Sequence, residues 1–135
     1  MRALIVDNDI SKVKAICEAL RSRFWSPTVW MARTSQEAVK LLSRLKDTYL
    51  DLVFLEHDLE SSDDASNGQT VATAMCEVGV KAKEVMIHTA NASGAEAMRN
   101  ILSPHYQVQR IPFPEVLKVI LDVTPGNSRV SAPTG

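Results

Sequence analysis

The sequence has few cysteines and no long apolar run. Its two cysteines, Cys17 and Cys76, fall on the apolar faces of predicted helices, where a small buried thiol is a more ordinary outcome than a redox centre. No apolar stretch approaches the length of a membrane span, and the N-terminus lacks the apolar core of a signal peptide. We therefore expect a cytoplasmic protein without a membrane partner.

The sequence also lacks an excess of charge of either sign. Its 15 Lys and Arg residues against 16 Asp and Glu residues give a net charge of -1. Broad binding to nucleic acid or to a membrane surface therefore has no electrostatic basis, although a local basic patch stays open. Arg2, the pair Arg21 and Arg23, and the pair Lys81 and Lys83 are separated in sequence, and we interpret them as solvated helix and loop ends.

Strand and helix patterns alternate from one end of the 135-residue chain to the other. Five βα units in a row predict a parallel sheet covered by helices on both faces. The predicted strands are about 2–7, 28–32, 50–56, 83–88 and 106–111, and the predicted helices are about 10–24, 34–45, 69–78, 93–103 and 113–122. We expect one domain over 1–123, a polar loop at 60–68, a flexible tail at 124–135 and no DNA-binding output domain.

Three polar clusters follow directly after three apolar runs. They are Asp7-Asn8-Asp9, Glu56-His57-Asp58 and His88-Thr89-Ala90-Asn91. Ligands of open parallel sheets bind beyond the carboxyl ends of the strands. We therefore expect these clusters to meet in one acidic pocket that contains histidine.

The acidic members of these clusters predict a cation site. Asp7, Glu56 and Asp58 would crowd negative charge together, and carboxylate oxygens suit Mg²⁺ or Mn²⁺. The alternative is that some of these acids cap helices. Asp9, which precedes the first helix, fits a cap better than a ligand.

His57 and His88 are the candidate acid–base pair. An imidazole changes charge near neutral pH, so two of them across a small pocket could act as general base and general acid on a phosphodiester. The alternative for each is a structural, hydrogen-bonded histidine.

The segment after the fourth strand offers an anion site. Asn91 could bind phosphate through its amide, and Gly94 lets the backbone of the next helix approach a ligand. Equally, Asn91 or Ser93 is the N-cap of that helix and Gly94 simply starts it.

The order of these features resembles the receiver domains of two-component response regulators over roughly residues 1–122. The resemblance implies a flavodoxin-like sheet with strand order 2-1-3-4-5, and it places Thr89 among the phosphate-binding residues. Glu56 stands where receivers have the phosphoacceptor aspartate, and Ile111 stands where they have a lysine before Pro112. Phosphotransfer needs the carboxylate, a divalent cation and that lysine's charge, so ordinary phosphorelay is not expected.

Four short motifs resemble a divergent receiver family more closely, that of the cyclic-phosphate processing receiver domains. They are Leu55-Glu56-His57-Asp58-Leu59, Ile87-His88-Thr89-Ala90-Asn91, Gly94-Ala95-Glu96-Ala97-Met98 and Arg110-Ile111-Pro112-Phe113. Glu56 replaces the usual aspartate of that family and Ala97 replaces the usual asparagine.

Two hypotheses follow. In the first, the domain binds or processes a phosphate-containing ligand, such as a cyclic-phosphate RNA end or a small cyclic nucleotide. The enzymatic form of this hypothesis is a phosphoesterase that acts on cyclic phosphates. In the second, it is a non-catalytic pseudo-receiver that contacts a protein partner through the face formed by its fourth helix, fifth strand and fifth helix, with Glu56 as a fixed negative charge.

Overall fold

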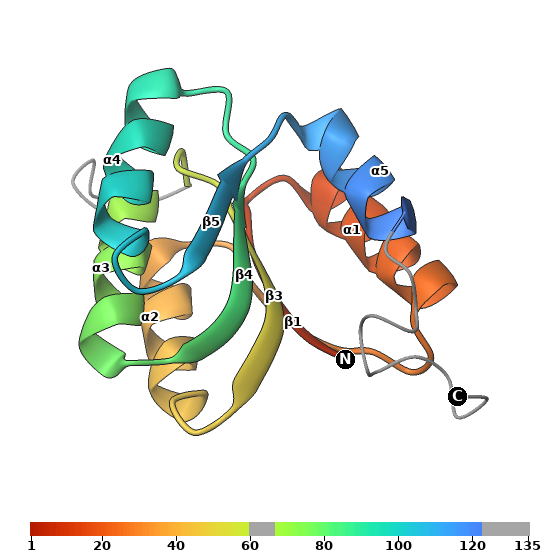
Figure 1. Ribbon diagram of the computed structural model, residues 1–135, viewed down its shortest axis with the longest axis horizontal. Coiled ribbons are helices and arrows are strands. Elements are labelled where there is room, and N and C mark those ends of the chain that lie inside the picture. The colour runs from red at the N-terminus through yellow and green to blue at the C-terminus, as the bar shows by residue number, and fades with distance from the viewer. Residues whose placement is uncertain (60–66, 123–135) are drawn as a thin grey trace.

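Figure 1 shows the computed structural model, which describes residues 1–59 and 67–122. Its described elements alternate between strand and helix, and their boundaries fall within about two residues of those expected. The strands are β1 (Arg2–Val6), β2 (Thr28–Ala32), β3 (Tyr49–Leu55), β4 (Lys81–Ile87) and β5 (Gln107–Arg110). The helices are α1 (Ile10–Arg23), α2 (Ser35–Arg44), α3 (Gly68–Val78), α4 (Ala92–Leu102) and α5 (Phe113–Asp122).

The strands form one parallel sheet in the order β2-β1-β3-β4-β5, which confirms the predicted topology. Helices α1 and α5 cover one face of the sheet, and α2, α3 and α4 cover the other (Figure 1). None of the helices in the described ranges combines the length and apolar character that a membrane span requires.

Side chains alternate between two buried clusters, one on each face of the sheet. In β3, Phe54 packs with the α1 and α5 side, whereas Val53 and Leu55 pack with the α2, α3 and α4 side. Val6 pairs with Leu55, and Leu55 pairs with Ile87, so the three strands end level with one another. The residues that follow them therefore begin at one height on the sheet edge.

Side chains and one glycine define the helix ends. Asp9 caps α1, as the sequence indicated, and the hydrogen bonds from Ser11 Oγ and Lys12 N lower its pKa. Thr34 caps α2, and Gly79 ends α3 in the left-handed conformation with φ 76°. This φ suits glycine because it has no Cβ.

The loop predicted at 60–68 ends earlier than expected. Asn67 is the N-cap of α3 and Gly68 is its first residue, because the Asn67 carboxamide accepts a hydrogen bond from Gln69 N. The rest of that loop and the predicted tail at 124–135 lie outside the described residues.

The two thiols are free cysteines within the packed layers. Cys17 is buried and Cys76 is half-buried, and burial raises the pKa of both. A raised pKa keeps a thiol protonated and unreactive at neutral pH, which favours the structural interpretation.

Candidate functional site

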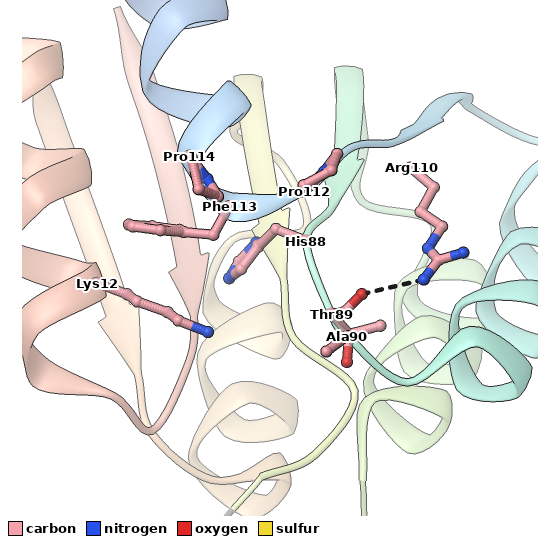
Figure 2. A pocket seen from close by; sticks show the side chains of 8 residues that line it. All are labelled: Lys12, His88, Thr89, Ala90, Arg110, Pro112, Phe113 and Pro114. Carbon is pink, nitrogen blue, oxygen red and sulfur yellow. Dashed lines mark hydrogen bonds between the residues drawn. The ribbon is translucent and has the colours of Figure 1, made fainter.

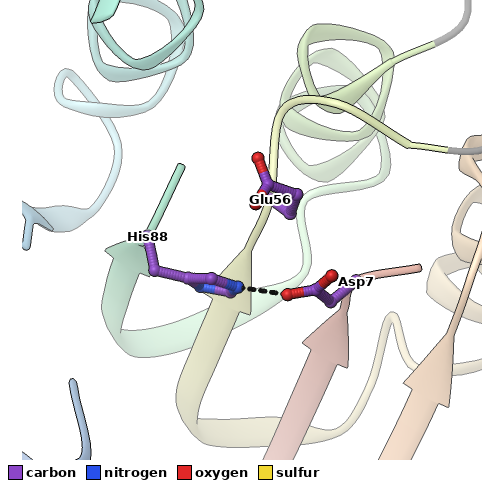
Figure 3. Close-up of side chains that lie close together, drawn as sticks. All are labelled: Asp7, Glu56 and His88. Atoms are coloured by element: carbon purple, nitrogen blue, oxygen red, sulfur yellow. Dashed lines mark hydrogen bonds and ion pairs between the residues drawn. The ribbon is translucent and has the colours of Figure 1, made fainter. Parts of the chain in front are cut away.

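Asp7, Glu56 and His88 form a row across the ends of β1, β3 and β4 (Figure 3). One ligand atom from each side chain lies within 4.8 Å of the others, and all three residues are buried. Strand register creates this row, because each residue directly follows one of three level, neighbouring strand ends. Two carboxylates and one imidazole at this spacing fit a divalent cation.

A short hydrogen bond joins the first and last members of the row. His88 Nε2 lies 2.7 Å from Asp7 Oδ2, and both side chains are at most 1% exposed. Because a carboxylate only accepts, Nε2 carries the proton of this hydrogen bond. Among the described residues Nδ1 has no hydrogen-bond partner.

Glu56 is held by its own backbone and by a lysine of α1. Its Oε2 accepts hydrogen bonds from His57 N at 2.9 Å and from Asp58 N at 3.2 Å. Its Oε1 lies 3.8 Å from Lys12 Nζ, which also lies 5.5 Å from the ring centroid of Phe113. A cation from α1 thus approaches the carboxylate that stands at the phosphoacceptor position of receivers.

His57 belongs to a different network on the α3 and α4 side. Its Nδ1 lies 2.8 Å from Asp58 Oδ1, and its Nε2 lies 3.2 Å from Gln69 Nε2. The partners assign the proton to Nδ1, which donates to Asp58, while Nε2 accepts from Gln69. Both ring nitrogens of His57 are therefore satisfied.

The structure does not bring His57 and His88 together as an acid–base pair, contrary to the sequence-based expectation. His57 packs against Gly94 and Gln69, on the side of α4 and α3, whereas His88 contacts Asp7 and Phe113, on the side of α1 and α5. The physical reason is alternation: His57 lies one residue beyond the row that contains Glu56, so it turns to the opposite face.

Asp58 is likewise separate from the predicted cation ligands. Its side chain is 65% exposed, and it accepts hydrogen bonds from His57 and from Asn91 Nδ2 at 3.1 Å. The bond from His57, followed by that from Asn91, lowers the pKa of Asp58. The third member of the candidate cation site, beside Asp7 and Glu56, is therefore His88 and not Asp58.

Asn91 and Gly94 adopt the capping alternative. Asn91 Oδ1 accepts a hydrogen bond from Gly94 N at 2.8 Å and its Nδ2 donates to Asp58, so both ends of the amide are engaged. Gly94 lies directly under the His57 ring, where an added Cβ would be 2.5 Å from Cγ of His57. Thr89 is buried, and its hydroxyl accepts a hydrogen bond from Asn91 N at 3.2 Å.

A pocket of about 600 Å³ includes His88, one member of the row, in its lining (Figure 2). Lys12 and Arg110 stand at its two ends, with His88, Thr89 and Pro112 between them. Ala90, Phe113 and Pro114 complete the lining. Arg110 also donates to the carbonyl oxygen of Thr89 at 3.4 Å. The pocket thus combines two cations, apolar walls and a buried imidazole.

Sequence reasoning gave no role in the site to Lys12, Gln69 or Phe113, although Phe113 belongs to one of the quoted motifs. Each lies in the first turn of a helix, one step beyond the residues that directly follow a strand. In a parallel sheet with βα connections the first helical turns lie at the same edge as the strand ends. Extending the search by one helical turn would therefore have included these residues.

Solved structures with similar folds are receiver domains. A chain of the CheX-CheY-BeF3-Mg+2 complex from Borrelia burgdorferi superposes with a TM-score of 0.64 at 19% identity, covering 90% of this chain and 87% of that chain. The N-terminal domain of a response regulator/sensory box/GGDEF 3-domain protein from Carboxydothermus hydrogenoformans gives a TM-score of 0.61 at 24% identity, with coverage of 90% and 91%. At these identities the likeness establishes the fold.

A response regulator from Burkholderia pseudomallei, solved with a phosphorylated aspartic acid, calcium ion and citrate, gives a TM-score of 0.62 at 15% identity. That match covers 95% of this chain and 68% of that chain. No match was found among curated proteins. A family model matches residues 3–104, and the chain therefore belongs to the family described as the cyclic-phosphate processing receiver domain.

Proposed function

We propose that this domain binds a phosphate-containing ligand together with a divalent cation and does not act as a phosphorelay receiver. The observation that carries the proposal is the buried row of Asp7, Glu56 and His88 beside a pocket with Lys12 and Arg110 at its ends. The family name and a neighbour solved with Mg²⁺ agree with this chemistry class.

The cation would be held by carboxylate oxygens of Asp7 and Glu56, which leaves the imidazole of His88 free to act on a proton. Two carboxylates this close repel each other, and a bound Mg²⁺ would relieve that repulsion and attract a phosphoryl group. Lys12, already 3.8 Å from Glu56, adds positive charge at the same end of the pocket.

His88 is the group best placed to move a proton. Asp7 fixes Nε2–H, so Nδ1 presents a lone pair that can accept the proton of an attacking water. In the opening of a cyclic phosphate, the water oxygen bonds to phosphorus as one ring P–O bond breaks. The proton taken by Nδ1 then returns to the departing oxygen. This mechanism uses one imidazole in two steps.

Two substitutions argue against phosphorelay. Glu56 is one methylene longer than the aspartate that receivers phosphorylate, so its attacking oxygen is displaced. Ile111, which stands at the lysine position, packs beside the apolar cluster of α1 and α5. The cation near Glu56 comes from α1, in the form of Lys12.

Histidine NMR can test the proposal. Mg²⁺ followed by a 2′,3′-cyclic nucleotide should shift the ring resonances of His88 well before those of His57, because only His88 lies in the row. Glu56→Gln should abolish the Mg²⁺ response, while Glu18→Gln, an exposed acid of α1, should leave it unchanged. Resonances of His88 that stay fixed up to millimolar Mg²⁺ and nucleotide would refute the proposal.

A second candidate is a non-catalytic module that binds a protein partner through α4, β5 and α5. One observation favours it: Lys12 and two backbone N–H groups already compensate the charge of Glu56 without any ligand. The CheX-CheY complex contains a receiver fold bound to a protein. This candidate predicts no His88 response to Mg²⁺ or nucleotide.

A further inference from the structure

We infer that the pocket between Lys12 and Arg110 binds two successive phosphates, so that the ligand is the end of a single-stranded oligonucleotide and not a mononucleotide. The inference rests on the proposed function and names its ligand class. It depends on the placement of the two cations and on the unpartnered nitrogen of His88.

The Lys12 end is where the reacting phosphate belongs. Lys12 Nζ lies near Glu56, and His88 lines the pocket between Lys12 and Arg110. Nδ1 of His88 is buried and has no partner among the described residues. Leaving a buried polar atom unsatisfied is destabilising, so such atoms call for an explanation. A ligand hydroxyl or water that donates to Nδ1 provides one.

The Arg110 end of the pocket offers a positive charge and hydrogen-bond donors to a second anion. Figure 2 places Arg110 across the pocket from Lys12, with Thr89, Ala90 and Pro112 between them. Its guanidinium gives one long hydrogen bond, 3.4 Å, to the carbonyl oxygen of Thr89. A guanidinium has five N–H donors, so this contact leaves donors for a phosphate.

The middle of the pocket suits the part of a ligand that joins two phosphates. Its walls are the apolar side chains of Ala90, Pro112, Phe113 and Pro114. Proteins that bind single-stranded nucleic acid combine cations that follow the backbone with aromatic or apolar surfaces for sugar and base. A free phosphate or a mononucleotide would leave one of the two cations without an anion.

Direct binding measurements separate the one-phosphate from the two-phosphate ligand. The probes are adenosine 2′,3′-cyclic monophosphate and the dinucleotide ApA that ends in a 2′,3′-cyclic phosphate, each with Mg²⁺. We expect the dinucleotide to bind about tenfold more tightly, and its affinity to fall more steeply with salt.

Removing the positive charge at the Arg110 end of the pocket and at the Lys12 end should affect the binding of the two probes differently. Arg110→Gln should weaken the dinucleotide about tenfold and leave the mononucleotide unchanged, whereas Lys12→Met should weaken both. The matched controls are Arg99→Gln on α4 and Lys14→Met on α1, both exposed residues outside the pocket lining. Neither control should affect either probe.

The outcomes distinguish this inference from the proposed function. If the wild-type protein binds the dinucleotide no more tightly than the mononucleotide, the two-phosphate site is wrong, while the proposed function stands on the mononucleotide. If Arg110→Gln weakens the binding of both probes equally, the assignment of the second phosphate to Arg110 is wrong. If neither probe binds the wild-type protein, both proposals fail.

Discussion

Two histidine–aspartate pairs lie at the same edge of the sheet, and they differ in almost every physical respect. His88 and Asp7 are joined at 2.7 Å with side chains at most 1% exposed, whereas His57 and Asp58 are joined at 2.8 Å with an aspartate that is 65% exposed. His57 has partners on both ring nitrogens, whereas within residues 1–59 and 67–122 His88 has a partner on Nε2 alone. The two hydrogen bonds are therefore similar in length, but one belongs to a fully hydrogen-bonded histidine and the other to a buried pair whose histidine has one nitrogen without a described partner.

This difference indicates which pair is available for chemistry. A ring whose two nitrogens are both satisfied must break a hydrogen bond before it can serve a ligand. His88 need break none, and it lies beside Glu56 and a pocket with two cations. The α1 and α5 side is thus the candidate for ligand binding, whereas the α3 and α4 side contains a histidine with both nitrogens hydrogen-bonded.

The largest expected difference between the two pairs is in stability. Asp7→Ala should lower the free energy of unfolding by about 3 kcal/mol, because it leaves the buried Nε2–H of His88 without an acceptor. Asp58→Ala should cost only about 0.5 kcal/mol, because its carboxylate is largely solvated. Urea unfolding followed by circular dichroism measures both. Equal losses would contradict the contrast drawn here.

A smaller loss of stability is expected when a methyl group is added beside His57. Gly94→Ala places a Cβ 2.5 Å from Cγ of His57, so the ring must move, at a cost of about 2 kcal/mol. In combination with His57→Ala, the same substitution should cost much less. His88 resonances and the Mg²⁺ response should be unchanged in Gly94→Ala. A loss of the Mg²⁺ response would show that the two sides are coupled.

The smallest expected effect is a pH dependence of stability that comes from the His57–Asp58 pair alone. The pKa of Asp58 is lowered from its ordinary value of 3.8 by the hydrogen bonds from His57 and Asn91. Its contribution to stability is therefore present above pH 3.8 and is lost as the pH falls through the lowered value. The carboxyl carbon resonance of Asp58 should titrate with a midpoint below pH 3.8 in a 13C NMR titration. A midpoint at or above pH 3.8 would contradict this assignment.

Much of the fold followed from local patterns. The apolar runs at β1, β3 and β4 predicted buried parallel strands, and Asp9 predicted the start of α1. These predictions succeed because alternation, helical spacing and capping are properties of short segments. The family motifs added the strand order, which local patterns alone do not specify.

The candidate site was predictable only in part. Asp7, Glu56 and His88 were all named from the sequence, and they do meet, but Asp58 and His57 belong to the other network. The two networks separate because only the residue directly after each strand end joins the row. Which residue that is depends on the register between strands that are far apart in sequence. Lys12 enters the site from a helix, by packing that no motif encodes.

The order of amino acids by itself determined the elements, the single parallel sheet and the kinds of side chain at its carboxyl edge, because these depend on neighbours within a few positions. Only the tertiary structure decided which of those side chains share a face. Adjacent residues such as Glu56 and His57 turn to opposite sides of a sheet, and their partners come from strands and helices tens of residues away.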